Sequence, residues 1–203
     1  MTKRQQQFIE TKNKLWEVGK EMIAERGYDQ VKISDITKAC GLSTGNFYHY
    51  FKSKDAFFAA LEQEPYDKLT EETRNLEGST LPDKLAYYIR ERFAFLGENS
   101  VNFTRQWIRH ASAPEYHELY QEDTKVDTDI RMIQQLIEEA VQAGELKDDT
   151  PVEPLAHMIV LTLFGTTFYY SVRDGKFELE RWGKDLTELL RTSVLAQYVN
   201  TGH

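Results

Sequence analysis

The stretch DITKACGLSTGNFYHYFKSKD, residues 35–55, decides the fold of the N-terminal part of the chain. Its pattern predicts two short helices, residues 33–39 and 43–50, with a break at Gly41, where a tight turn favours the residue most tolerant of positive φ. Ser43 is well placed to cap the second helix, because a serine oxygen can accept a backbone N–H there. Two short helices that cross steeply around such a turn form a helix-turn-helix.

The side chains of this motif divide into an inner and an outer set. The apolar residues expected where the helices touch are Ile36, Cys40, Leu42, Phe47 and Tyr50. The residues left to face outward along the second helix are Ser43, Thr44, Gly45, Asn46, Tyr48 and His49. An exposed polar helix held in this way is the part of a helix-turn-helix that enters the major groove of DNA.

Charge is distributed unevenly along the 203 residues. Residues 1–60 contain ten Lys and Arg against seven Asp and Glu, whereas the remainder contains 15 against 26, and the chain has a formal net charge of −8. Acidic surface repels nucleic acid. We therefore expect only the N-terminal part to meet a polyanion.

Nearly every other segment also has helical periodicity, and we find no convincing strand pattern, repeat or low-complexity tract, so we expect an all-α fold. We call residues 1–53 the head and residues 54–203 the body. The first expected helix has an apolar stripe and ends at Gly27; the stripe is formed by Leu15, Val18, Gly19, Met22 and Ile23. A helix that begins at Lys54 is expected to extend past Leu69 despite Pro65. The remaining expected helices are Leu81–Gly97, Val101–Ala111, Pro114–Ala143, Pro151–Val172 and Leu179–Val199.

Residues 11–61 resemble the TetR family of bacterial transcription regulators. The segments ERGYDQ and ISDITKACGLSTGNFYHYFKSKDAFF carry the resemblance, with the Gly-Tyr pair, GLS, GNFYHYF and KSK in family order and spacing. The body resembles the family in length and helix count. The resemblance implies a three-helix DNA-binding domain in residues 1–53, a larger helical ligand-binding and dimerisation domain in residues 54–203, and a cytoplasmic regulator that binds double-stranded DNA.

The resemblance also assigns roles to single residues of the motif. The positions at which family members read base edges are occupied here by Thr44, Gly45 and Asn46, next to the capping Ser43. A threonine methyl group can touch thymine, and an asparagine can pair with adenine. The positions at which family members hold phosphates are occupied by Tyr48, His49 and Lys54.

One position departs from the family pattern. Lys32 stands where many members have a Ser or Thr that caps the second helix, so we expect the cap to be lost and Lys32 to contact a phosphate instead. Basic residues near the N-terminus, Lys3, Arg4, Lys12 and Lys14, leave two interpretations open: a solvated tail, or a flexible arm that reaches DNA.

Because one recognition helix reads few base pairs, we expect a homodimer on a palindromic operator. The last predicted helix has an apolar face formed by Leu179, Trp182, Leu186, Leu189, Leu190, Val194 and Tyr198. Together with residues 155–172 it would form a four-helix interface with a second chain, as the resemblance implies. The alternative is that the apolar face belongs to the core of a single chain.

Aromatic residues are abundant in the body, and the resemblance implies that this region encloses a pocket for a small hydrophobic effector whose binding releases a repressor from its operator. The candidate pocket residues are Phe103, Trp107, His110 and Phe168. Arg105, Arg109 and His157 are further candidates for orienting a ligand, although each is expected to be exposed or paired with a neighbour. The alternative function is a helical protein-interaction module, or a regulator controlled by a protein partner.

Other classes of protein find little support. The single cysteine, Cys40, indicates a reducing compartment, and the N-terminal residues lack the apolar run of a signal peptide. The run 155–172 has no charged residue but includes His157 and several hydroxyl side chains, so we expect a buried helix and no membrane span. His110, Glu115 and His117 lack a recognised metal-ligand spacing. We therefore expect no enzyme, no metal and no cofactor.

Overall fold

The computed structural model describes residues 2–112 and 125–200, and these form helices and connecting turns. The head contains α1 (Lys3–Arg26), α2 (Ile33–Ala39) and α3 (Thr44–Phe47), with a short 3-10 turn, Tyr28–Gln30, between the first two. The body contains α4 (Lys54–Arg74), α5 (Leu81–Glu98), α6 (Val101–Ser112), α8 (Lys125–Gln142), α9 (Val152–Val172) and α10 (Leu179–Leu189). The predicted all-α fold is confirmed.

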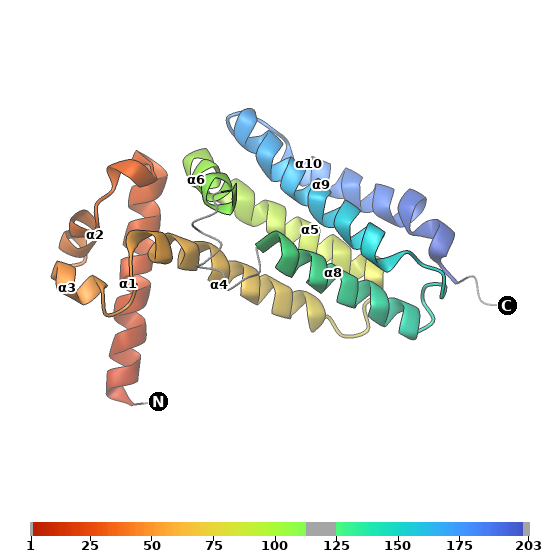
Figure 1. Ribbon diagram of the computed structural model, residues 1–203, viewed down its shortest axis with the longest axis horizontal. Coiled ribbons are helices and arrows are strands. Elements are labelled where there is room, and N and C mark those ends of the chain that lie inside the picture. The colour runs from red at the N-terminus through yellow and green to blue at the C-terminus, as the bar shows by residue number, and fades with distance from the viewer. Residues whose placement is uncertain (1, 113–124, 201–203) are drawn as a thin grey trace.

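The molecule is elongated, with the head at one end (Figure 1). In the body, α5, α8, α9 and α10 run along the long axis, α4 leads from the head along the same axis, and α6 lies between the head and the rest of the body. The C-terminus lies at the end of the body farthest from the head (Figure 1). The head therefore meets the body through α4 and α6, and also where Nζ of Lys20 on α1 lies 5.9 Å from the ring centroid of Phe95 on α5.

The helix boundaries follow from local capping chemistry. Thr2 and Gln5 form a reciprocal capping box at the start of α1, and the chain leaves that helix at Gly27, whose φ is 82°. Ser53 accepts a hydrogen bond of 2.9 Å from the backbone N–H of Ala56 at the start of α4. Pro65 lies inside α4, which nevertheless continues to Arg74, as predicted.

Three predicted boundaries differ from the structure. Because α1 begins at Lys3, the basic residues near the N-terminus belong to a helix and form neither a tail nor a flexible arm. The helix expected over 43–50 ends at Phe47 and continues as a tight turn. The single helix expected over 179–199 ends at Leu189, after which a π-helical turn, Leu190–Val194, and a 3-10 turn follow. The helix expected over 114–143 can be compared with the structure only from residue 125 onward, where it corresponds to α8.

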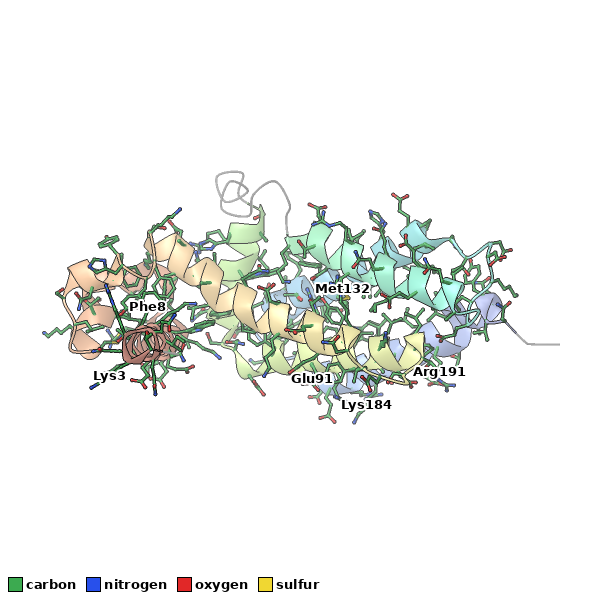
Figure 2. The ribbon with its side chains drawn as sticks, turned by 90° about the horizontal axis from the view of Figure 1, so that it is seen from below. Lys3, Phe8, Glu91, Met132, Lys184 and Arg191 are labelled. Atoms are coloured by element: carbon green, nitrogen blue, oxygen red, sulfur yellow. The ribbon has the colours of Figure 1, made fainter. Side chains whose placement is uncertain are left out.

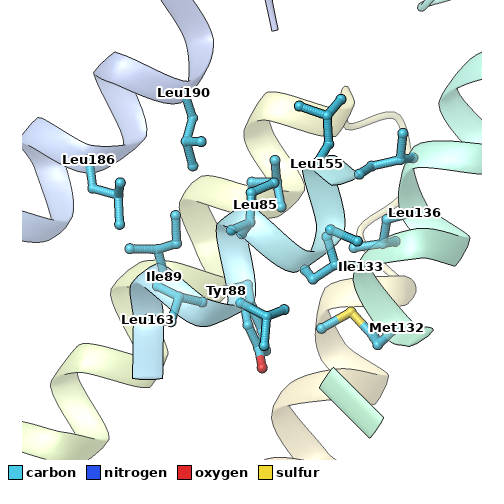
Figure 3. Packing of buried hydrophobic residues seen from close by; sticks show 14 of the residues in the cluster. Leu85, Tyr88, Ile89, Met132, Ile133, Leu136, Leu155, Leu163, Leu186 and Leu190 are labelled. Carbon is cyan, nitrogen blue, oxygen red and sulfur yellow. The ribbon is translucent and has the colours of Figure 1, made fainter. Parts of the chain in front are cut away.

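Two apolar clusters form the interior. The body cluster unites α4, α5, α8, α9 and α10. Figure 3 shows side chains from this cluster packed together, among them Leu85, Ile133, Leu163 and Leu186. The head cluster unites α1 to α4 with α6; its fully or nearly buried members are Leu15, Ile23, Val31, Ile36, Cys40, Phe47, Phe51, Phe57, Phe58, Leu61, Phe103 and Trp107. The expected domain boundary between residues 53 and 54 falls at the start of α4, whereas the head cluster continues to Leu61 and takes in α6.

Candidate DNA interface and effector region

The turn between α2 and α3 is built as the glycine predicts. Gly41 has φ of 69°, and a Cβ there would lie in open space but in a backbone conformation that side chains disfavour. The backbone N–H of Leu42 donates to the carbonyl of Thr37 at 2.8 Å, which closes the end of α2. The hydroxyl of Ser43 accepts a hydrogen bond from the backbone N–H of Asn46, so the predicted cap of α3 is confirmed.

Aromatic side chains fix the orientation of α3. Phe47 is fully buried, with ring centroids 5.4 Å from Phe51 and 5.5 Å from Phe57. Tyr50 is half-buried, and its ring lies 4.6 Å from that of Phe8 on α1. The prediction that Phe47 lies where the helices touch is confirmed, and Phe51 is buried beside it. The short helix is therefore held by its inner side, which leaves its outer side free.

The outer side of α3 carries the residues expected to meet DNA. Five of the six are exposed, namely Ser43, Thr44, Gly45, Tyr48 and His49. Asn46 is half-buried, and its side-chain oxygen accepts a hydrogen bond of 3.2 Å from the hydroxyl of Ser43. Lys32 is exposed at the start of α2, where its own side chain makes no capping hydrogen bond and its backbone N–H donates to the carboxylate of Asp35 at 3.1 Å. The contacts of these residues with DNA stay predictions.

Lys54 is placed differently from the other predicted DNA contacts. Its ammonium group donates a hydrogen bond to the backbone carbonyl of Tyr28 and lies 3.9 Å from the centroid of the Tyr28 ring. Burial lowers the pKa of Lys54, an effect that Asp29 and Asp55 oppose. In this conformation Lys54 ties α4 to the turn that follows α1. No local pattern in the sequence predicts this contact.

The candidate pocket residues on α6 lie at the junction of head and body. Phe103 and Trp107 are buried, with the Phe103 ring 4.9 Å from Phe58 and the Trp107 ring 5.2 Å from Phe164 on α9. A void of about 20 Å³ lies beside them. Phe168 is 58% exposed on α9, so the structure does not bring it to the other candidates.

His110 completes this junction as a neutral group. Its side chain is 1% exposed, its ring lies 4.8 Å from Phe58, and its Nε2 lies 2.7 Å from Nε2 of Gln106. Burial lowers the pKa of His110 to about 4, although the nearby carboxylate of Asp55 opposes the shift. At neutral pH the imidazole is therefore uncharged and serves as a hydrogen-bonding part of the interior.

The other polar residues considered as ligand groups have partners in the protein. Arg105 pairs with Asp174 at 3.0 Å, and Arg109 pairs with Asp29 at 2.9 Å. The ring of His157 lies 2.9 Å from the backbone carbonyl four residues earlier. The expectation that each would be satisfied by a neighbour is confirmed.

Sequence reasoning missed a buried ionic cluster in the body. Arg92 on α5 pairs with Asp129 on α8 at 2.7 Å, and Lys125 pairs with the same carboxylate at 3.2 Å. All three side chains are less than a tenth exposed. A signal was present, because Arg92 follows Tyr88 by four residues and therefore falls on the apolar side of α5.

Two larger hollows lie on the surface of the body. A groove of about 740 Å³ runs between α5 and α10, over a floor that includes Phe93, Leu179 and Gly183. Its rim includes Glu91 and Lys184, and Figure 2 places both labels on the same side of the body. A second cleft, of about 190 Å³, lies between α4 and α5 and is lined by residues that include Pro65, Tyr66 and Phe95. Neither hollow coincides with the residues that the sequence indicated.

Two further interpretations of the sequence concern a metal site and a membrane-spanning helix. Among the described residues, no three His, Cys, Asp or Glu side chains lie together in a way that could hold a metal ion. Of the spacing considered in the sequence, Glu115 and His117 lie outside the described residues. By length and composition α9 could cross a membrane, but half of its most apolar window is buried inside the protein, as in the core helix of a water-soluble fold.

Comparisons with known proteins find relatives of the head and of the whole chain. The sequence profile described as "Bacterial regulatory proteins, tetR family" matches residues 15–61. The Fatty acid metabolism regulator protein of Bacillus subtilis (strain 168) is 29% identical over 177 residues, which cover 86% of this chain and 90% of that protein. The HTH-type transcriptional repressor NemR of Escherichia coli (strain K12) is 34% identical over 83 residues, 39% of this chain and 42% of that protein.

Solved structures share the arrangement of both parts. The fatty acid degradation regulator FadR from Bacillus halodurans has a TM-score of 0.74 at 20% identity and covers 91% of this chain and 96% of its own. FadR from Bacillus subtilis, solved in complex with stearoyl-CoA, has a TM-score of 0.70 at 24% identity and covers 88% of this chain and 97% of its own. The helix-turn-helix and the profile match that spans it show that residues 15–61 form a DNA-binding domain of the kind found in the tetR family of bacterial regulatory proteins, and over most of its length the chain is similar to a regulator from Bacillus subtilis.

Proposed function

We propose that the protein is a cytoplasmic transcriptional repressor that binds a palindromic operator as a homodimer and is released by a small acyl effector. One observation carries the proposal: a polar, exposed α3 is held rigidly by the buried ring of Phe47. Because the helix is already ordered, its side chains can read base edges in the major groove without the loss of conformational entropy that a flexible segment would suffer on binding. The strongly acidic body then stays away from the phosphate backbone.

The side chains on α3 divide by chemistry into two roles. Thr44 and Asn46 offer a methyl group and an amide to base edges, and Tyr48 and His49 offer hydrogen bonds to phosphates. Lys32 adds an exposed cation at the start of α2, the helix that precedes α3 in the motif. Lys54 would reach a phosphate only after leaving the carbonyl of Tyr28, so we give it a smaller role than the sequence indicated.

An exposed apolar ridge on α9 supports the homodimer. Its large side chains are between 39% and 61% exposed and recur at helical spacing: Met158, Leu161, Phe168, Tyr169 and Val172. Leu189 at the end of α10 is also half exposed. A continuous apolar strip of this kind marks an interaction site, and a second copy of the same helix is its natural complement in a two-fold dimer.

The contribution expected from the last helix needs correction. Leu186 and Leu190 are 7% and 4% exposed and pack against the α5 side of the body, so they belong to the core of one chain. The reason is the register of α10: the face with Leu179 and Leu186 is turned inward, which leaves Leu189 outside. Charged substitutions at Leu186 or Leu190 would unfold the body before they could report on dimerisation.

The class of effector is inferred from relatives. The Bacillus subtilis relative is named a fatty acid metabolism regulator, and a FadR with the same fold was solved with stearoyl-CoA. The body of this chain contains the aromatic and aliphatic side chains that an acyl chain would need. A ligand that prefers one arrangement of the heads by 1–3 kcal/mol would change DNA affinity by about 5- to 150-fold.

The test begins with selection of an operator from random duplexes, followed by affinity measurements over a range of salt. We expect Asn46→Ala to cost about 1–3 kcal/mol on the selected site and little on random DNA, because it would remove a base contact. Lys32→Ser should weaken both duplexes equally and reduce the salt slope by about one per head. Absence of any selected sequence, or equal losses for Asn46→Ala on both duplexes, would contradict the proposal.

A further inference from the structure

Arg92 lies in the middle of the body with its charged group removed from water. The side chain is 1% exposed, and its Nη1 donates to Asp129 at 2.7 Å and to the hydroxyl of Tyr88 at 3.2 Å. The guanidinium carbon lies 4.6 Å from the ring centroid of Phe164 and 5.1 Å from that of Tyr66. An arginine in such surroundings is placed for recognition of a planar anion.

Two of the three nitrogens of this guanidinium lack an acceptor. Nε and Nη2 of Arg92 are buried and make no hydrogen bond within the part of the chain that the structure describes. A buried donor without an acceptor is costly, and native proteins contain few of them. Nε and one Nη can together donate to both oxygens of one carboxylate. The free donors of Arg92 therefore match a bound carboxyl group.

The charges around Arg92 also favour an added anion. Arg92 and Lys125 share the single carboxylate of Asp129, so the cluster has two cationic side chains and one anionic side chain. Burial lowers the pKa of Lys125, and the nearby Arg92 adds to the effect. Burial opposes ionisation of Asp129, but its two cationic partners hold its pKa below the ordinary value. These three side chains together carry one excess positive charge, and Asp67, outside the cluster, is a further carboxylate that acts to raise the pKa of Lys125.

Tyr66 stands between this cluster and two hollows. Its ring lies 3.8 Å from Nζ of Lys125. The same residue lines both the 190 Å³ cleft between α4 and α5 and the 20 Å³ void beside Phe103 and Trp107. Tyr66 therefore borders the cleft, the void and the guanidinium of Arg92, whose carbon lies 5.1 Å from the centroid of its ring.

We propose that Arg92 anchors the carboxyl oxygens of the effector, with the aliphatic part directed toward Phe103 and Trp107 on α6. This inference rests on the proposed function, in which an acyl compound enters the body. A carboxylate would supply both the missing acceptor and the missing negative charge. Because Phe103 and Trp107 belong to the head cluster, an aliphatic chain beside them would contact side chains that also pack against the head.

The test compares three ligands with the same 18-carbon chain, namely stearate, octadecanol and stearoyl-CoA, on the full-length protein by calorimetry and by release of operator DNA. We expect stearate to bind the unmodified protein at least tenfold more tightly than octadecanol, because only stearate offers Arg92 a charged acceptor. Arg92→Gln should abolish this preference and leave octadecanol binding unchanged. Arg90→Gln, an exposed arginine on the same helix, is the matched control and should change nothing.

Each remaining outcome decides the proposal. If Arg92→Gln proves unstable, Arg92→Lys replaces it; this variant keeps the charge and should retain part of the preference for stearate. The comparison of stearate with octadecanol on the unmodified protein requires no variant. Sensitivity of stearate to Arg92→Gln would support the anchored carboxylate. Sensitivity of stearoyl-CoA alone would contradict it, because a thioester carbonyl is uncharged and offers a single acceptor oxygen. Equal binding of stearate and octadecanol would contradict the role of Arg92 but leave the acyl effector of the proposed function in place. Failure of all three ligands to bind would overturn the acyl effector and the anchor together.

Discussion

Nη1 of Arg109 on α6 donates a hydrogen bond of 2.9 Å to Oδ2 of Asp29 in the head, although 80 residues separate them in the sequence. Both side chains are more than 60% exposed, so the ion pair contributes little to stability, about 0–1 kcal/mol. Its position is more informative than its strength. Together with Phe103 and Trp107, it fixes the end of α6 against the turn that follows α1.

We therefore expect Arg109→Ala to lower the free energy of unfolding by less than about 1 kcal/mol. The factor by which an acyl effector lowers DNA affinity should fall, because α6 would be less firmly joined to the head. Thermal unfolding and operator titrations with and without stearate measure the two quantities separately. Arg105→Ala, which removes an exposed pair on the side of α6 that faces Asp174, is the control and should leave the effector response intact.

The neutral, buried His110 predicts a loss of stability in mild acid. Its pKa is about 4 in the folded protein against 6.5 for the free side chain, so below pH 6.5 the unfolded chain binds a proton that the folded chain does not. Stability should therefore fall as the pH is lowered from about 6.5 to 4, by about 1.4 kcal/mol per unit at most. Denaturant unfolding at several pH values measures this slope.

His110→Gln should remove that part of the pH dependence, because a glutamine can replace the hydrogen bond to Gln106 without titrating. His49→Gln, at an exposed position of the head, should keep the slope of the unmodified protein. The same slope in all three proteins would mean that His110 is accessible to protons in the folded state.

Gly19 is required where α1 packs against α4. A Cβ at this position would lie 2.3 Å from Cζ of Phe57, a ring that is itself fully buried. Gly19→Ala should therefore destabilise the head by about 1–3 kcal/mol, despite the better helix propensity of alanine. Chemical denaturation measures the loss.

The matched substitution Gly97→Ala introduces a Cβ that meets only Cδ1 of Leu179, at an ordinary 3.8 Å. It should leave stability unchanged or raise it by up to about 1 kcal/mol. Similar effects at Gly19 and Gly97 would show that Phe57 can move aside at no cost.

The ridge on α9 predicts how the dimer can be broken. Leu161→Glu combined with Phe168→Glu should give a folded monomer, because both residues are more than half exposed within one chain but would bury unpaired charges between two. Sedimentation should show the monomer, and affinity for the palindromic duplex should fall with it. Gln142→Glu combined with Ala143→Glu adds the same charge at exposed positions near the end of α8 and should leave the dimer intact. A dimer that survives the α9 changes would place the interface elsewhere.

Local patterns in the sequence were sufficient for most of the head. Gly41, Ser43 and the spacing of Ile36 and Phe47 fix the turn through interactions within about fifteen residues, and such interactions can be read along the chain. The end of α3 at Phe47 was misjudged, because the tight turn that follows depends on packing of Phe51 against Phe57. The placement of Lys54 on Tyr28 depends on tertiary structure in the same way.

In the body, the class of each helix could be predicted but its orientation could not. The apolar residues of α10 form one face in the sequence, and only the packed structure shows that Leu186 lies inside while Leu189 lies outside. Charged residues are ordinarily exposed, so the place of Arg92 on the apolar side of α5 does not by itself predict its burial. Its partner Asp129 lies 37 residues further along the chain. Contacts over such distances leave no periodic signal in a single sequence.

The sharing of α4 and α6 between the two apolar clusters has a consequence for building chimaeric regulators. The chain passes from the head cluster at Leu61 to the body cluster at Tyr66, with Pro65 directly before the change. A head transplanted by cutting at residue 53 would leave Phe57 and Phe58 facing foreign side chains, and no single cut would bring Trp107 with it. A working exchange of operator specificity must therefore replace α1 to α3, the first part of α4 and the inward side of α6 as one unit.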